Sequence, residues 1–307
     1  MEHPQPFRGI FTIPATPFRK SGEIDVVGLR RIVDFCIECS AHGLVYPVNA
    51  SEFTTLSDEE RMRMSQVLVE QDAGRIPAII GVSGVSMEVA AGFAAHAKQI
   101  GADGVIAMPP YVRRAELRLD AIYDYYQTIS DSGGLPIFIQ NYVPPLGTNL
   151  SADFMVRMCR EIEHVEYIKE ETVPSTLKLT DVLKLDTDGV CKGVFGGAGG
   201  RYMVEEHRRG SAGNMPGCHV TDVVVAFWQA LEDGDEARAL HIYKEMAPLF
   251  FYEHQLPGTY KEVLVRRGVI DCALSRNAPV PTDQTGSAYL NEILSDLRPL
   301  MTWESGS

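Results

Sequence analysis

The segment Val165-Glu166-Tyr167-Ile168-Lys169-Glu170-Glu171 places a lysine and two glutamates at the end of a short apolar run. Nearly continuous apolar runs bounded by Gly, Pro or polar residues are typical of parallel strands that are covered on both faces. Seven other runs have this character, at residues 9–13, 44–48, 78–82, 104–108, 136–140, 189–195 and 213–215. The pattern therefore predicts eight strands, with Lys169 at the end of the sixth.

Helical patterns lie between the predicted strands. Ser57-Asp58-Glu59-Glu60 has the spacing of a capping box, and an Ala-rich helix is expected from Ser86 to Ile100, directly before Gly101. Further helices are predicted at residues 25–39, 119–129, 152–162 and 176–185. Eight strand–helix units in about 230 residues predict an α/β fold, the (β/α)8 or TIM barrel.

The alternative fold is a doubly wound parallel sheet, which usually has fewer strands and a glycine-rich turn after the first one. Here the first predicted strand runs into Pro14-Ala15-Thr16-Pro17-Phe18, which cannot form that turn. After about residue 221 the pattern is entirely helical, at residues 223–231, 236–251, 261–267 and 288–297. We therefore expect a barrel at residues 7–220 and a C-terminal helical extension at residues 221–307.

The composition excludes several classes of function. The 307 residues include 28 Lys and Arg against 41 Asp and Glu, a formal net charge of −13, whereas nucleic-acid binding needs clustered basic residues. No apolar run reaches the roughly 18 residues of a membrane span, and residues 1–6 lack the basic and apolar parts of a signal peptide. Six Cys in a chain of this length do not make a disulfide scaffold. We expect a cytoplasmic protein that binds neither nucleic acid nor membrane.

Lys169 is the most specific candidate for chemistry, because the active site of a barrel lies at the carboxyl ends of its strands. A desolvated lysine can act as a nucleophile that forms a Schiff base with a carbonyl substrate. The alternative is an exposed lysine that pairs with Glu170 or Glu171. Because side chains alternate along a strand, Glu171 is expected on the side of Lys169 and Glu170 on the other side.

The ends of the other predicted strands supply further candidates. Glu52 follows the second strand and is a candidate acid, with bracing of its loop as the alternative. Gly196 and Gly197 follow the seventh strand and can offer backbone groups to substrate hydroxyls, because glycine allows close approach. The alternative for these glycines is a tight loop before a helix.

Several motifs occur in a fixed order along the chain. They are Phe11-Thr12-Ile13-Pro14-Ala15-Thr16-Pro17-Phe18, residues 22–25, 43–52 and 56–61, Gly101-Ala102-Asp103-Gly104 before Pro109-Pro110-Tyr111, and Ile168-Lys169-Glu170. In this order they resemble the dihydrodipicolinate synthase and N-acetylneuraminate lyase family. The resemblance implies a (β/α)8 barrel in which Lys169 forms a Schiff base with a 2-oxo acid. It also implies that Tyr111 shuttles protons, that no cofactor or metal is needed, and that the protein is a homotetramer.

The segment after the second predicted strand departs from the family pattern. Members usually carry Gly-Thr-Thr-Gly-Glu there and bind the substrate carboxylate with its hydroxyls and amides, whereas this chain has Val48-Asn49-Ala50-Ser51-Glu52. Asn49 and Ala50 stand in place of the two threonines, and Ser51 replaces a glycine. We expect Asn49, Ala50 and Ser51 to bind the carboxylate in a rearranged way, through the Ser51 hydroxyl and backbone N–H groups.

The fifth predicted strand departs further. Members that make or break C–C bonds usually carry Tyr-Asn-Val-Pro, and the aligned segment here is Asn141-Tyr142-Val143-Pro144. This alignment puts Asn141 at the substrate, and an amide cannot act as a general base. A shift of one residue would restore Tyr142 but would turn the side chains to the other face. Near Leu146 no arginine is available for a second carboxylate, which favours a monocarboxylate substrate.

A Schiff base at C2 of a 2-oxo acid still allows a proton to leave C3 and a hydroxyl to leave C4, with Glu52, Glu171 or Tyr111 as the acid. The segments around Ser51-Glu52 and Lys169-Glu170-Glu171-Thr172 are similar to the L-2-keto-3-deoxyarabonate dehydratase branch of the family. We therefore expect a lyase that dehydrates a 2-keto-3-deoxy sugar acid. The alternatives are an aldolase that releases pyruvate and a barrel that binds a 2-oxo acid without catalysis.

Overall fold

The computed structural model describes residues 6–111, 118–144, 146–256, 258–277 and 282–303 of the chain. Eight parallel strands close into a barrel in chain order, so the predicted TIM-barrel fold is confirmed. The strands are β1 (Gly9–Thr12), β2 (Gly43–Tyr46), β3 (Ala78–Gly81), β4 (Gly104–Ala107), β5 (Ile137–Asn141), β6 (Val165–Glu170), β7 (Gly193–Gly196) and β8 (Gly213–Asn214). The chain packs as two compact units, both of which contain barrel strands.

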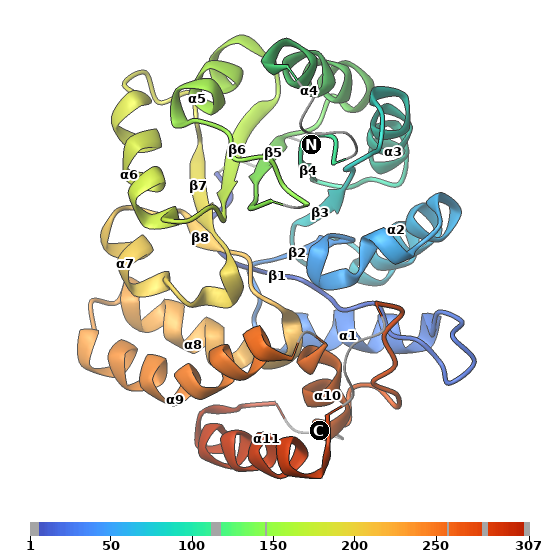
Figure 1. The fold of residues 1–307 in the computed structure, drawn as a ribbon, viewed down its shortest axis with the longest axis vertical. Coiled ribbons are helices and arrows are strands. Elements are labelled where there is room, and N and C mark those ends of the chain that lie inside the picture. The colour runs from blue at the N-terminus through green and yellow to red at the C-terminus, as the bar shows by residue number, and fades with distance from the viewer. Residues whose placement is uncertain (1–5, 112–117, 145, 257, 278–281, 304–307) are drawn as a thin grey trace. The chain divides into compact units, whose positions relative to one another are not determined.

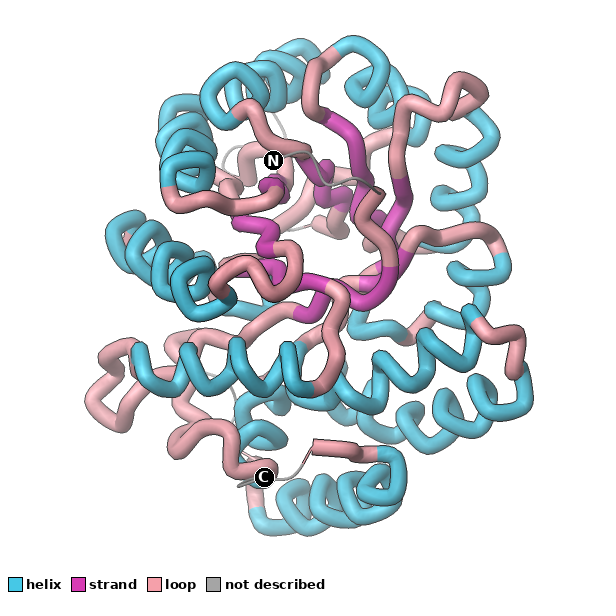
Figure 2. The backbone as a smooth tube through the Cα atoms, turned by 180° about the vertical axis from the view of Figure 1, so that it is seen from behind, coloured by secondary structure: helices cyan, strands magenta, loops and turns pink. Residues whose placement is uncertain are grey.

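The first compact unit comprises the chain up to Gly9 together with Pro77–Met215, and it holds β3 to β8. Nearly every residue of these strands is buried, which explains why their sequences are continuously apolar. The helices of this unit are α3 (Met87–Gln99), α4 (Leu119–Gly133), α5 (Ala152–Glu161), α6 (Ser175–Leu185) and α7 (Met203–Arg208). In Figure 1 these helices lie outside the strands of the unit, and Figure 2 shows the same layering from behind.

Strand β7 is shorter than the apolar pattern predicts. The carboxylate of Asp186 accepts hydrogen bonds from the backbone N–H groups of Val190, at 2.9 Å, and Cys191, at 3.1 Å. These bonds hold residues 190–191 in a turn after α6, so the strand begins only at Gly193.

Strand β6 contains an irregularity where it pairs with β5. Ile137 lies opposite Val165, but the next residue of β5, Phe138, lies opposite Tyr167. Glu166 is therefore the extra residue of a β-bulge, and every pair beyond it is offset by one residue. The bulge decides which side chains of β5 lie beside the end of β6.

The second compact unit comprises Ile10–Ile76 and Pro216–Ser307 and holds the parallel pair of β1 and β2. Its helices are α1 (Val26–Glu38), α2 (Asp58–Asp72), α8 (Thr221–Glu232), α9 (Glu236–Gln255), α10 (Thr259–Arg266) and α11 (Gln284–Leu297). The predicted capping box at the start of α2 is confirmed: the Ser57 hydroxyl accepts from the Glu60 N–H, and the Glu60 carboxylate accepts from the Ser57 N–H.

Helix α8 is fixed to the later part of the unit by a buried ion pair. Both nitrogens at the end of Arg267 donate to the carboxylate of Asp222, at 2.8 and 2.7 Å, and the backbone N–H of Thr302 also donates to it. Because α8 is the next α-helix after β8 in the chain, it completes the eighth strand–helix unit. The expected division at residues 220 and 221 stays a prediction, and a cut there would separate β8 from its helix.

Two further features of the described residues concern helix length and the cysteines. Among the described residues, no helix combines the length and the apolar character that crossing a membrane requires. All six cysteines are free thiols.

Candidate active site

Lys169 lies near the carboxyl end of β6, and only 3% of its side chain is exposed. Its Nζ is 3.2 Å from Oε2 of Glu171, which also accepts a hydrogen bond from Nε2 of Gln140 at 2.8 Å. The other oxygen of Glu171 accepts from the backbone N–H of Ala198 at 3.1 Å. Three donors therefore converge on one carboxylate, an arrangement that suits its ionised form. The alternative of an exposed Lys169 is excluded, and Glu171 lies on its side as strand alternation predicts.

The β-bulge in β6 changes which residue of β5 faces this pair. Gln140 lies opposite Lys169, and Asn141 lies opposite Glu170. Without the bulge, the register would have placed Asn141 opposite Lys169. Gln140 is therefore the amide beside the candidate nucleophile, and no sequence signal marks the bulge that puts it there.

The amide of Asn141 is engaged away from Lys169. Its nitrogen donates to Oε2 of Glu170 at 2.7 Å and to the carbonyl of Leu150 at 3.2 Å, and its oxygen accepts from the N–H of Leu150 at 2.9 Å. Glu170 also accepts from the backbone N–H of Thr172, at 2.6 Å. Burial raises the pKa of Glu170, and these hydrogen bonds act against that rise. Asn141 thus secures the turn after β5, and its expected substrate contact has no support from these bonds.

Gly196 and Gly197 leave room for two carboxylates. A Cβ atom on Gly197 would lie 2.3 Å from Oε1 of Glu171, and one on Gly196 would lie 2.0 Å from Oε2 of Glu206. Cβ atoms essentially never approach other atoms this closely, so a side chain at either position would force its neighbour to move. The sequence predicts that these glycines offer backbone groups to the substrate. The structure gives them a second reason to be glycine.

Glu206 was not singled out from the sequence, because nothing near it in the chain marks it as functional. It lies on α7, is 1% exposed, and accepts a hydrogen bond from Nδ2 of Asn214 at 2.9 Å. Burial raises the pKa of Glu206 to about 8, the Asn214 hydrogen bond acts against that rise, and the charges of Glu171 and Glu170 add to it. The raised pKa favours the protonated form of this carboxyl.

Two tyrosines belong to the same unit as Lys169. Tyr111 is half-buried after β4, and its expected role in proton transfer stays a prediction. Burial raises the pKa of the Tyr142 hydroxyl, the charge of Glu171 adds to this rise, and the guanidinium of Arg201 opposes it. Tyr142 and Arg201 are therefore within electrostatic reach of each other, although no sequence motif marks Arg201 as a basic group of the site.

The segment Asn49–Ser51 forms a short 3-10 helix after β2 in the second unit. Ser51 is fully buried, its hydroxyl donates to the carbonyl of Pro14 at 2.7 Å, and its own carbonyl accepts from the hydroxyl of Thr16. The Ser51 hydroxyl can therefore accept a further hydrogen bond, but its proton is engaged. The expectation that Asn49, Ala50 and Ser51 bind the substrate carboxylate stays a prediction.

Glu52 lies in a buried ion pair within the second unit. Its carboxylate pairs with Lys261 of α10, and only 9% and 3% of the two side chains are exposed. The same carboxylate accepts from the hydroxyl of Ser275 and from the backbone N–H groups of Arg276, at 2.9 Å, and Asn277, at 3.1 Å. With four donors on its two oxygens, Glu52 has the geometry of a loop brace, which is the alternative that the sequence left open.

Two cationic side chains reinforce this brace. Lys261 lies 4.3 Å from the ring centre of Phe18, and the guanidinium of Arg276 lies 4.5 Å from the same centre. Arg276 also pairs with Glu60 of α2 and donates to the carbonyl of Gly22. Residues 274–277 thus hold the loops after β1 and β2, and we call this arrangement the tail brace.

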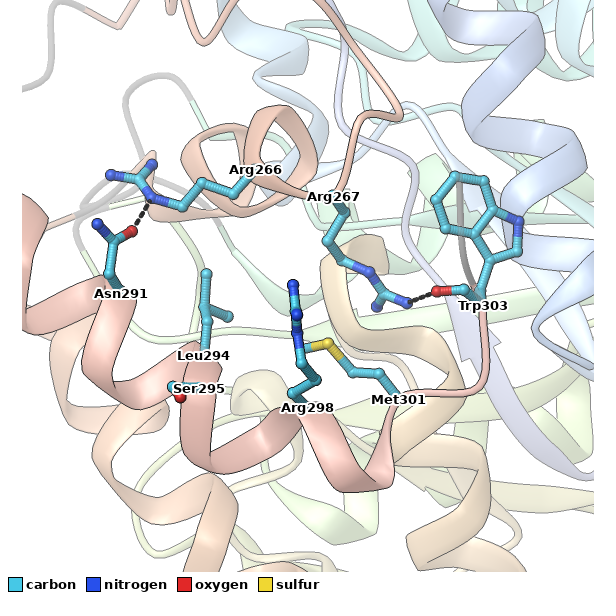
Figure 3. Close-up of a pocket in the computed structure, with 8 residues that line it drawn as sticks. All are labelled: Arg266, Arg267, Asn291, Leu294, Ser295, Arg298, Met301 and Trp303. Atoms are coloured by element: carbon cyan, nitrogen blue, oxygen red, sulfur yellow. Dashed lines mark hydrogen bonds between the residues drawn. The ribbon is translucent and has the colours of Figure 1, made fainter. Parts of the chain in front are cut away.

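A pocket with a volume of about 670 Å³ lies between α10, α11 and residues 301–303 (Figure 3). Arg266, Arg267 and Arg298 line it, together with Trp303. Arg267 is already bound to Asp222, and Arg266 is bound to Glu262 and Asn291. No residue predicted from the sequence for substrate binding or catalysis lines this pocket, so it is not the candidate active site.

A closed barrel of eight parallel strands with a buried lysine–glutamate pair at the end of β6 defines a TIM-barrel enzyme site. Comparison with protein families agrees with this class. The chain belongs to the dihydrodipicolinate synthetase family, whose model matches residues 6–297. Family-level lyase activity follows from this membership.

Individual relatives carry different names within the family. L-2-keto-3-deoxyarabonate dehydratase of Azospirillum brasilense is 34% identical over 298 residues, which cover 96% of each chain. A probable 2-dehydro-3-deoxy-D-pentonate aldolase of Escherichia coli is 33% identical over 165 residues, covering 53% of this chain and 54% of the relative. The crystal structure of dihydrodipicolinate synthase from Rhodopseudomonas palustris matches the fold with a TM-score of 0.87, at 24% identity over 94% of this chain and 97% of that one. These names agree on the family and differ on the reaction.

Proposed function

We propose that the protein is a lyase in which Lys169 forms a Schiff base with a 2-oxo acid and which dehydrates a 2-keto-3-deoxy sugar acid. The buried pair of Lys169 and Glu171, with the amide of Gln140 beside it, carries this proposal. An amide cannot remove a proton from a substrate hydroxyl, so the arrangement favours a reaction that needs no base there. The 34% identical dehydratase from Azospirillum brasilense supports the same choice.

The first step uses Lys169 as the nucleophile. The ion pair transfers one proton from Lys169 to Glu171, and the free amine attacks the C2 carbonyl of the substrate. Glu171 then returns this proton to the carbinolamine hydroxyl, which leaves as water, and the product is an iminium that joins Nζ to C2. The positive charge of the iminium draws electrons from the C2–C3 bond and makes a C3 proton acidic.

The second step removes water from the substrate. Glu171 takes the C3 proton, and the electron pair forms an enamine between C2 and C3. The same carboxyl returns the proton to the C4 hydroxyl, which leaves as water while the enamine electrons form a conjugated iminium. Addition of water at C2 then releases the product and restores Lys169, so the net change is the loss of one water.

The other candidate residues take supporting roles in this proposal. Gln140 and the backbone N–H of Ala198 hold the Glu171 carboxylate in place. Tyr111 is proposed as a proton shuttle and the segment Asn49–Ser51 as the carboxylate-binding loop, both on the family resemblance. Glu52 is left out as an acid, because its oxygens are occupied by Lys261 and the backbone of residues 276–277.

A pyruvate-releasing aldolase is the second candidate function. It needs a group that removes a proton from the C4 hydroxyl, and the electrostatic link of Tyr142 to Glu171 and Arg201 supplies the observation in its favour. The probable 2-dehydro-3-deoxy-D-pentonate aldolase of Escherichia coli, which matches this chain over 165 residues, supports it as well. A raised pKa reduces the fraction of Tyr142 in the phenolate form, which is the form that can take up this proton, so the aldolase ranks below the dehydratase.

The decisive experiment incubates the purified protein with five- and six-carbon 2-keto-3-deoxy sugar acids. Mass spectrometry then separates a product that has lost one water from pyruvate. Release of pyruvate as the main product would replace the dehydratase proposal with the aldolase. The stereochemistry of the best substrate follows from the same panel of acids.

Borohydride reduction in the presence of pyruvate tests the Schiff base itself. We expect a covalent adduct on Lys169 and none in Lys169→Ala. The matched control is Lys192→Ala, which removes an exposed lysine of the same unit that pairs with Glu166. If no 2-oxo acid forms an adduct while the protein still binds one, the non-catalytic barrel is the better description.

Assembly and location are proposed on the family resemblance and the composition. We propose a homotetramer that works in the cytoplasm on a small 2-oxo acid without a cofactor. Light scattering on the purified protein tests the tetramer, and a mass equal to a single chain would contradict it.

A further inference from the structure

Three buried carboxyl groups gather at the carboxyl ends of β6 and β7. Glu170 belongs to β6 and Glu206 comes from α7, and each is 1% exposed, whereas Glu171 directly follows Glu170 and has 9% of its side chain exposed. Among the described residues, Lys169 pairs with Glu171, and no cation pairs with Glu206. Because buried like charges disfavour each other's ionisation, a group of three carboxyls with so few cations favours a proton on at least one of them.

The surroundings of Glu206 suit a neutral carboxyl. From β8, the Asn214 amide donates to one oxygen, and from β7, Gly196 contributes no side chain at all. From α6, the buried hydroxyl of Ser175 lies near the carboxyl and has no hydrogen-bond partner among the described residues. A protonated carboxyl has one O–H donor, which the Ser175 oxygen can accept.

The charged groups that face Glu206 are both negative. They are Glu171 and Glu170, at the end of β6. Burial makes the largest contribution to the raised pKa of Glu206, and the charges of these two carboxylates add to it. The hydrogen bond from Asn214 and the nearby hydroxyl of Ser175 lower this pKa without cancelling the rise. Burial and charge therefore both favour a proton on Glu206, and hydrogen bonding only reduces their effect.

We propose that Glu206 is a positioning residue that stays protonated at neutral pH and keeps the Lys169–Glu171 pair balanced, with one positive charge against one negative charge. The inference rests on the proposed function, because it assumes that Lys169 is the nucleophile. Once Glu206 loses its proton, a second negative charge faces the pair and favours the protonated ammonium of Lys169. An ammonium cannot attack a carbonyl, so Glu206 sets the alkaline limit of imine formation.

The test compares the rate of borohydride trapping of pyruvate on Lys169 between about pH 6 and about pH 10. Glu206→Gln keeps the shape of the side chain and imitates its neutral form. Glu205→Gln is the matched control, because Glu205 is the preceding residue of α7, is 52% exposed and pairs with Arg209. We expect equal rates near pH 7. Above about pH 8, Glu206→Gln should trap roughly five to ten times faster than the wild-type protein, and Glu205→Gln should follow the wild type.

Infrared spectroscopy of the wild-type protein gives a second readout that needs no reaction. The carbonyl stretch of a buried protonated carboxylic acid should be present at neutral pH, fade above about pH 8 and be missing in Glu206→Gln. Superimposed trapping profiles of wild type and Glu206→Gln would overturn the inference, as would more than tenfold slower trapping by Glu206→Gln at pH 7. If pyruvate is trapped by none of the proteins, the proposed function fails, and the infrared band alone then supports or overturns the protonated state.

Discussion

Gly197→Ala tests directly whether the position of Glu171 controls the reaction. The new Cβ atom would lie 2.3 Å from Oε1, 2.4 Å from Cγ and 2.5 Å from Cδ of Glu171. Contacts become ordinary at 3.4 Å, so the carboxylate has to move by at least about 1.1 Å. The φ angle of Gly197 is −146°, outside the left-handed region, so the collision with Glu171 is the main consequence of the substitution.

A displacement of this size breaks the geometry that three donors now define. The Ala198 N–H is 3.1 Å from one oxygen of Glu171, and Lys169 Nζ is 3.2 Å from the other. Since a misplacement of about 1 Å can lower a rate by about a hundredfold, we expect kcat/KM to fall by about that factor. This corresponds to about 2.7 kcal/mol of lost transition-state stabilisation.

The assay is steady-state dehydration of the best sugar acid, accompanied by a thermal melt. Gly92→Ala is the matched control, because a Cβ on this glycine of α3 would meet no atom within 4 Å. It should keep full activity and gain roughly 0.4–1 kcal/mol of stability. Activity of Gly197→Ala within threefold of the wild type would refute the reasoning, since Glu171 would then tolerate displacement.

Two further predictions concern stability. Lys261→Met leaves the Glu52 carboxylate buried without its cation, so it should lower the free energy of unfolding by about 3 kcal/mol in a denaturant titration. The control Lys192→Met removes a half-exposed ion pair and should lower this free energy by less than about 1 kcal/mol. Equal effects of the two substitutions would contradict the tail brace. Because the pKa of Glu206 is raised from 4.5 to about 8, the folded state binds the extra proton between these values, so wild-type stability should fall as the pH rises through this range and level off above about 8. Glu206→Gln should lack this part of the pH dependence, and thermal melts at several pH values would show otherwise if the carboxyl were ionised throughout.

The fold could be predicted from the sequence because a strand that is buried on both faces has a recognisable local pattern of apolar residues. Each strand of the barrel is covered on both sides, and each therefore appears as a short continuous apolar run. The start of β7 was harder to predict, since the Asp186 carboxylate holds apolar Val190 outside the strand. Such a bond depends on the path of the backbone, which hydropathy does not report.

The sequence predicts only those features of the candidate site that depend on a single strand. Strand alternation alone places Glu171 on the side of Lys169. Gln140 was missed because the β-bulge at Glu166 shifts the pairing of two strands by one residue, and no local pattern reveals it. Glu206 was missed for a related reason: it meets Gly196 only through the packing of a helix against a strand.

The tail brace has a consequence for building hybrids of this barrel with its relatives. Glu52 belongs to the loop after β2, but all of the donors on its carboxylate come from residues 261–277. A hybrid that exchanges the helical tail alone would leave the buried Glu52 carboxylate without its donors. A hybrid that exchanges the loop alone would leave the buried Lys261 ammonium without its carboxylate partner. Loop and tail therefore form one transferable module, although more than two hundred residues separate them along the chain.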